Sequence, residues 1–232
     1  MTGAPLVIKG TVTKVKKVNG APAAAGSPAR NYLLVNVQVE ALIRGEGGVA
    51  PVINFLMLDT GSKDFPKKKQ PVLLFAQPTG TPGSVQLVSR SAIRPWTAGT
   101  EATIRAITAE VLKNDSPPAI RGIGDAFHIA GTIAGEGETQ IFLKTATGAP
   151  VSLSIVRRPG QPPQWGVSLG EIVDEAAVPP ARDTLLWYRL ACGLPASLPP
   201  ESTRTLPLID AEAARRDYGF VMESLGRCDR TL

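Results

Sequence analysis

Residues 33–42 of this 232-residue chain, LLVNVQVEAL, carry its clearest periodicity. Apolar side chains occupy every second position from Leu33 to Ala41, and the positions between them include an asparagine, a glutamine and a glutamate. A period of two places the two sets on opposite sides of an extended chain. We therefore predict a half-buried antiparallel strand, which ends at the glycine-rich residues 44–48.

Other segments near this strand also have a strand-like composition. They are residues 6–18, with a bend near Gly10, and residues 52–58, 72–76 and 85–88. Polar or basic links separate them, including residues 19–30 and 63–69. Five strands within about 85 residues, with a long second strand, are typical of a small five-stranded barrel. We therefore predict an OB-like β-barrel over residues 5–95.

The order of four sequence blocks carries a family resemblance. The blocks IKGTVTKV, YLLVNVQVEALIRGE, PVINFLM and QPVLLFAQ contain G-x-V, then V-x-V followed by a glycine, then V-L-L-F. This order resembles the OB-type barrel of netrin-like domains, the family that includes metalloproteinase inhibitors, and it covers residues 6–89. The resemblance implies the fold. Inhibition in that family depends on an N-terminal cysteine, and the first cysteine here is Cys192, so we do not expect inhibitory activity.

Residues 96–232 predict a different arrangement of elements. Apolar positions spaced as on a helix face predict a helix over residues 100–113 with Thr100 as its N-cap. Four strand-like segments with short turns between them predict an antiparallel meander over 126–173, at residues 126–134, 139–147, 151–158 and 164–173. Two helices follow, 183–192 capped by Asp183 and 210–225 capped by Asp210. The predicted fold is α+β: a five-stranded OB-like β-barrel followed by a four-stranded antiparallel meander with three helices.

The charge is divided unevenly along the chain. Residues 1–95 hold 12 lysines and arginines against 4 acidic residues, a balance of +8. Residues 96–232 hold 13 against 16, a balance of −3. This break indicates two folding units with different surfaces, of which the first attracts anionic partners.

The basic loop at residues 63–69 is the strongest candidate for a ligand-binding surface. It combines an aromatic side chain with four lysines: Lys63, Phe65, Lys67, Lys68 and Lys69. Barrels of this type bind extended anionic polymers with basic residues and exposed aromatic rings. The alternative is that these lysines keep a sheet-rich protein soluble and prevent its edges from pairing.

Few residues suit catalysis or metal binding, and we expect no catalytic, metal or cofactor-binding site. His128 is the single histidine, and Asp125 lies three positions away, on the opposite face of a strand. We expect a structural histidine. No glycine-rich phosphate-binding motif is present. Four carboxylates remain as candidates for a hydrolase site: Asp125, Glu138, Glu171 and Asp174.

The two cysteines, Cys192 and Cys228, each lie near the end of a predicted helix. We predict a disulfide between them, with two buried free thiols as the alternative. No apolar run approaches the roughly 20 residues that cross a bilayer, and no signal peptide begins the sequence. We expect a periplasmic or secreted protein whose signal peptide has been removed, with a cytoplasmic protein as the alternative.

These observations favour a non-catalytic binding or assembly protein of the bacterial envelope. Its basic barrel surface would take an anionic polymer, a lipid surface or a partner protein. The alternatives are a carboxylate-based hydrolase and a cytosolic OB protein that binds nucleic acid, and we consider nucleic acid the less favoured ligand.

Overall fold

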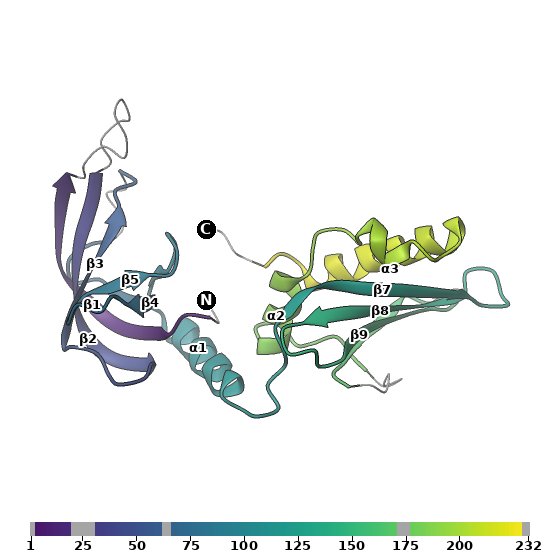
Figure 1. The fold of residues 1–232 in the computed structure, drawn as a ribbon, viewed down its shortest axis with the longest axis horizontal. Helices are drawn as coiled ribbons and strands as arrows, with labels where there is room; N and C mark the ends of the chain where they lie inside the picture. Colours follow the sequence, from purple (N-terminus) through teal and green to yellow (C-terminus); the bar gives the residue numbers. More distant parts are fainter. Residues whose placement is uncertain (1–2, 20–30, 62–65, 171–176, 229–232) are drawn as a thin grey trace. The chain divides into compact units, whose positions relative to one another are not determined.

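The computed structural model describes residues 3–19, 31–61, 66–170 and 177–228 (Figure 1). The chain divides after Ala109 into two compact units, called unit 1 and unit 2 below. Residues 1–109 hold 13 basic and 5 acidic residues, and residues 110–232 hold 12 and 15. The excess of positive charge therefore belongs to unit 1. No described helix is long and apolar enough to cross a membrane.

Unit 1 is built on a six-stranded antiparallel sheet. Its strands are β1 (Leu6–Asn19), β2 (Asn31–Arg44), β3 (Val52–Leu58), β4 (Pro71–Pro78), β5 (Val85–Leu87) and β6 (Ile93–Pro95). The strand order is β3-β2-β1-β4-β5, and β6 pairs with β4. The sequence predicted five strands. It missed β6, which at three residues is too short to show a period.

The predicted alternation in β2 is confirmed. Leu33, Val35 and Val37 are buried in the core of unit 1, together with Ile8, Phe55 and Leu74 from neighbouring strands. The bend expected near Gly10 corresponds to a register shift between Lys9 and Gly10 in the β1–β2 pairing. A Cβ atom at Gly10 would collide with the carbonyl oxygen of Gln38, so only glycine fits this close approach of β1 to β2.

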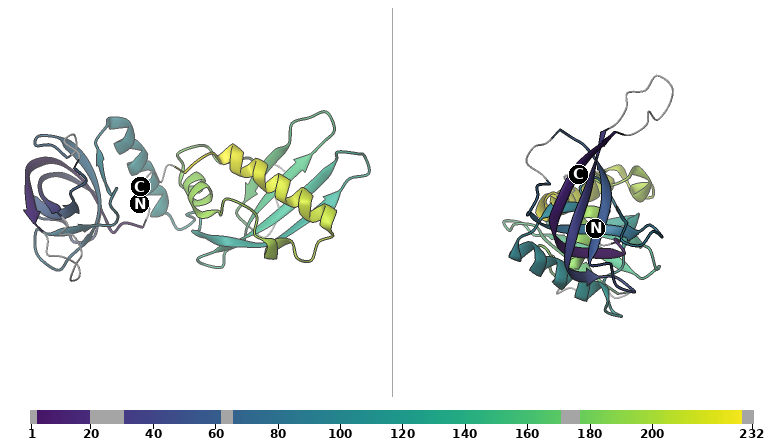
Figure 2. Two further views of the ribbon diagram at one scale, coloured as in Figure 1. Left: turned by 90° about the horizontal axis from the view of Figure 1, so that it is seen from above. Right: turned by 90° about the vertical axis from the view of Figure 1, so that its left-hand side faces the viewer.

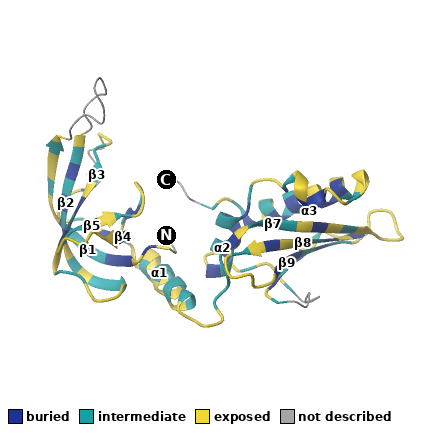
Figure 3. Cartoon of the chain, in the orientation of Figure 1, coloured by how far each residue is buried: buried dark blue, intermediate teal, exposed yellow. Residues whose placement is uncertain are grey.

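The helix of unit 1, α1 (Ala98–Val111), begins two residues before the prediction. The cap is Thr97 rather than Thr100, because the Thr97 hydroxyl oxygen accepts a hydrogen bond from the backbone N–H of Thr100 at 3.1 Å. No residue of α1 is fully buried (Figure 3). Ile104 packs against a small cluster that includes Val7 and Phe75.

Unit 2 contains the predicted four-stranded antiparallel meander. Its strands are β7 (Ile120–Ala130), β8 (Gly137–Thr145), β9 (Val151–Arg157) and β10 (Gln164–Ser168), in the order β10-β9-β8-β7. β7 begins six residues before the prediction. Two register shifts, at Ile120/Gly122 and Ile123/Ala126, interrupt the alternation of buried and exposed residues there. Without that alternation, the sequence pattern did not predict this part of the strand. Part of the predicted last strand, residues 171–173, lies outside the described residues.

Two further helices and a short 3-10 helix complete unit 2: α2 (Leu185–Gly193), η1 (Pro200–Thr203) and α3 (Leu208–Leu225). In Figure 2, α3 crosses one face of the meander. Both predicted caps are wrong. Thr184 caps α2 by accepting from the Trp187 N–H at 3.3 Å, whereas Asp183 accepts from the hydroxyl of Tyr188. α3 begins after Pro207 and has no side-chain cap, and Asp210 lies in its first turn.

Candidate functional site

The described lysines of the predicted loop, Lys67 to Lys69, lie beside β1. Lys67, Lys68 and Lys69 are exposed, and Lys63 and Phe65 lie outside the described residues. β4 pairs with β1 only from Leu6 to Thr11. Beyond that point the N–H of Lys69 donates to the carbonyl oxygen of Val12 at 2.7 Å, and the N–H of Val12 donates to that of Gln70 at 2.9 Å. This contact brings the lysine loop to the part of β1 that carries Lys14 and Lys16.

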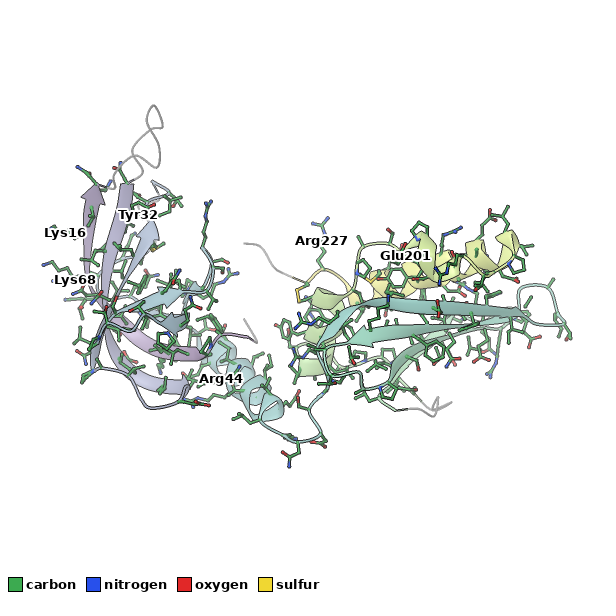
Figure 4. All side chains as sticks on the ribbon, in the orientation of Figure 1. Lys16, Tyr32, Arg44, Lys68, Glu201 and Arg227 are labelled. Carbon is green, nitrogen blue, oxygen red and sulfur yellow. A yellow bond between two sulfur atoms is a disulfide. The ribbon has the colours of Figure 1, made fainter. Side chains whose placement is uncertain are left out.

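Four exposed lysines of this region have no ion-pair partner among the described residues. They are Lys14, Lys16, Lys68 and Lys69. Figure 4 shows Lys16 and Lys68 projecting from the β1 side of the sheet. Lys17 is different, because its Nζ lies 3.2 Å from Asp59 Oδ2. The backbone N–H of Gly61 and then Lys17 lower the pKa of Asp59.

Lys9 also forms internal contacts and is therefore not one of these four lysines. Its Nζ lies 3.1 Å from Glu101 Oε2 and 4.4 Å from the ring centre of Trp96. The indole Nε1 of Trp96 and the guanidinium of Arg105 donate to the same carboxylate at 2.7 and 2.9 Å. These contacts, that of Trp96 foremost, lower the pKa of Glu101 to about 2. Trp96 therefore helps to fix α1 to the sheet.

The outer side of β1, β2 and β3 places apolar side chains beside the lysines. Lys16 of β1 pairs with Leu34 of β2, which pairs with Leu56 of β3. Two residues further along β1, Val18 pairs with Tyr32, which pairs with Leu58. All six side chains lie on the side of the sheet opposite the buried Val35. Leu56 is 57% exposed. We call this surface the basic–apolar face, defined by Lys14, Lys16, Val18, Tyr32, Leu34, Leu56 and Leu58.

Among the described residues of unit 2, the most deeply buried acidic side chain is that of Asp217 of α3, which is only 1% exposed. Its Oδ1 accepts a hydrogen bond from Nε of Arg157, at the end of β9. Its Oδ2 accepts from the hydroxyl of Thr139 on β8. Nδ1 of His128 on β7 lies 2.8 Å from that hydroxyl. The cluster therefore joins α3 to three strands of the meander.

A cleft of about 510 Å³ adjoins this cluster. His128 and Arg157 line it together with Arg216 and with three carboxylates, those of Glu136, Asp210 and Glu212. Two arginines facing three carboxylates favour neither an anionic nor a cationic ligand. The Thr139 hydroxyl is fully buried, so a substrate in the cleft could not reach it. The arrangement suits a structural role for His128.

The carboxylates proposed for a hydrolase do not converge. Asp125 and Glu138 are exposed and do not line the cleft, and Glu171 and Asp174 lie outside the described residues. Within the described ranges, no group of three or more histidine, cysteine or acidic side chains is arranged to hold a metal ion.

The predicted disulfide between Cys192 and Cys228 is confirmed, with Cα atoms 5.2 Å apart. It connects the last turn of α2 to the residues that follow α3. The helix ends meet because Trp187 of α2 packs in the same core as Leu225 of α3, and the indole Nε1 of Trp187 donates to the carbonyl oxygen of Leu225 at 3.1 Å.

Sequence reasoning missed the Asp217 cluster, although one signal for it was present. Asp217 falls within the apolar stripe of the predicted helix, four positions after Ala213 and four before Val221. A charge in such a position needs a buried partner. The partner, Arg157, lies 60 residues away, on the inward side of β9 after Leu153 and Ile155.

No known family model matches this chain. No match was found among curated proteins.

Proposed function

We propose that this chain is a non-catalytic binding or assembly protein of the bacterial envelope, and that an anionic ligand or partner binds to unit 1. The observation that carries the proposal is the group of four exposed lysines, Lys14, Lys16, Lys68 and Lys69, with no ion-pair partner among the described residues. Their mutual repulsion costs free energy in the unbound protein, and an anionic ligand would relieve it.

The proposed fold of unit 1 is an OB-like barrel of the netrin type. The sheet order supports it, and so does an isolated bridge between Asn54 on β3 and Ser84, next to β5. This bridge brings the first and last strands of the order together, as in a barrel. OB-type barrels bind ligands on the face of strands 2 and 3, which here contributes Leu34 and Leu56 to the basic–apolar face.

The disulfide supports an oxidising compartment, because cytosolic thiols are kept reduced. We therefore propose a periplasmic or secreted protein. A cytosolic nucleic-acid binder is less favoured for a second reason. Single-stranded nucleic acids stack on exposed aromatic rings. Phe55 and Phe75 are 1% and 6% exposed, and Tyr32 is the single aromatic residue of the basic–apolar face.

The proposal is tested by anisotropy measurements with labelled polyphosphate and by sedimentation with vesicles that contain phosphatidylglycerol, at about 20, 150 and 500 mM salt. We expect affinity for at least one probe that falls as salt rises. Replacing Lys14, Lys16, Lys68 and Lys69 together by glutamine should weaken binding by about tenfold or more.

The matched control removes four exposed cations of unit 2, Lys113, Arg121, Lys144 and Arg158, by the same substitution to glutamine. This variant has the same net charge as the first and should retain most of the affinity. Absence of binding at low salt, or equal losses in both variants, would refute the assignment of the ligand surface to unit 1.

A further inference from the structure

The basic–apolar face combines lysines with leucines, and a purely electrostatic site does not need the leucines. Along one row of paired residues, Lys16 lies beside Leu34 and Leu34 lies beside Leu56. Neighbouring strands are about 4.8 Å apart, so the lysine and both leucines form one continuous surface. Exposed apolar side chains bordered by charge are typical of interaction surfaces.

The polarity of this face changes along the strands. The row formed by Lys14, Asn36 and Asn54 is polar, the next row contains Lys16 with Leu34 and Leu56, and the last contains Val18, Tyr32 and Leu58. The apolar side chains therefore gather toward the end of β1, and the lysines lie along its length. Such a gradient matches the boundary between lipid headgroups and acyl chains.

We propose that the basic–apolar face binds the surface of an anionic lipid bilayer, with Leu56 and Leu34 entering the headgroup region and Lys14 and Lys16 contacting lipid phosphates. This inference rests on the proposed function and specifies its ligand. Lysine suits the role because its long aliphatic stem lies along apolar surface while its ammonium group reaches the phosphates.

The composition of the face argues against the other ligands. Aliphatic leucines offer neither a stacking plane for bases nor hydrogen bonds for sugars, which makes an extended polymer a poorer match. Lysine is depleted at the centres of protein–protein interfaces, and here Lys16 is part of the same row as the leucines. An anionic bilayer uses both residue types, because its phosphates attract the lysines and its interface accepts the leucines.

Unit 2 provides an internal comparison. Ile129 is 74% exposed on β7, more than Leu56, but its cross-strand neighbour is Glu138 rather than a lysine. If exposure of an apolar side chain were sufficient for binding, Ile129 would contribute as much as Leu56. If the combination with lysines matters, only Leu56 should contribute.

The test is sedimentation of the full chain with vesicles of phosphatidylglycerol and phosphatidylcholine at about 3:7, beside vesicles of phosphatidylcholine alone. We expect binding to the anionic vesicles only. Lys16→Gln should weaken it about fivefold, since one basic residue near an anionic surface contributes about that factor. Leu56→Ser should weaken it severalfold, and Ile129→Ser should leave it unchanged.

Each outcome bears on a separate claim. Binding to polyphosphate without binding to vesicles overturns the lipid inference and leaves the proposed function in place. Vesicle binding that Lys16→Gln weakens and Leu56→Ser does not would also overturn it, because the apolar contact would be absent. Failure to bind either probe at low salt refutes both proposals. Lys16, Leu56 and Ile129 are all exposed, and circular dichroism of the variants verifies folding.

Discussion

The carboxylate of Asp217 accepts a hydrogen bond from Nε of Arg157, 60 residues earlier in the chain, in the interior of unit 2. The side chain of Asp217 is 1% exposed and that of Arg157 is 22% exposed. Removal of one member of a buried ion pair leaves the other charge without compensation, which costs more than the loss of a surface pair. The pair therefore fixes α3 against β9.

We expect Asp217→Asn to destabilise unit 2 by about 3 kcal/mol or more, because Arg157 would lose its counterion and Thr139 its charged acceptor. Urea unfolding followed by tryptophan fluorescence measures this change, since Trp165 and Trp187 both lie in the core of unit 2. Asp125→Asn, at an exposed position of the same unit, should change the stability by less than about 0.5 kcal/mol. Equal effects of the two substitutions would contradict a buried pair.

His128 should carry its proton on Nδ1. The Thr139 hydroxyl has a single hydrogen, which it donates to Asp217, so its oxygen accepts from Nδ1–H of His128 at 2.8 Å. Because the chain has one histidine, a long-range ¹H–¹⁵N spectrum at neutral pH contains one imidazole pattern. Thr139→Val should remove the preference for this tautomer. A neutral imidazole protonated on Nε2 in the unmodified chain would contradict the arrangement.

Glu101 predicts how the stability of unit 1 depends on pH. Its pKa falls from 4.5 to about 2 in the folded chain, because Trp96, Arg105 and Lys9 contact the ionised form. A lowered pKa contributes stability that is complete above about pH 4.5 and is lost as the pH falls toward 2. Urea unfolding of Glu101→Gln should therefore show lower stability than the parent above pH 4.5, with the difference shrinking below it. A difference independent of pH would contradict this account.

The disulfide should stabilise unit 2 alone. It closes a loop of 37 residues, from Cys192 to Cys228, for which chain entropy predicts about 3–4 kcal/mol. Cys192→Ser with Cys228→Ser should therefore lower the unfolding free energy reported by Trp165 and Trp187. Dithiothreitol should have the same effect on the parent chain and none on the double variant. Two free thiols detected by alkylation of the native, oxidised protein would contradict the pairing.

Gly10 should resist substitution. In Gly10→Ala the new methyl group meets the carbonyl oxygen of Gln38 and the side chain of Val37, so β1 must move away from β2. We expect a loss of about 1–3 kcal/mol from overpacking. Gly122→Ala, in β7, is the control, because nothing lies within 4 Å of the added Cβ atom. Thermal unfolding of the two variants makes the comparison, and a Gly10→Ala chain as stable as Gly122→Ala would contradict the close approach.

Local patterns in the sequence predicted the elements better than their ends. The alternation around Val35 and Val37 identified β2 and its buried side, because side-chain direction in a strand repeats every two residues whatever packs against it. Caps were predicted less well. Asp183 and Thr184 are both good capping residues, and only the backbone path into α2 assigned the role to Thr184.

The sequence by itself determined the α+β composition, the meander, the excess of positive charge in the first half and the pair of cysteines, because each depends on composition or on spacing along one segment. Tertiary structure decided which charged side chains form ion pairs within the protein. It paired Lys9 with Glu101 and Lys17 with Asp59, buried Asp217 against Arg157, and placed Lys16 beside Leu34 and Leu56. These relationships join strands and helices far apart in the chain, and the free energy of a charge depends on the neighbours that packing brings to it.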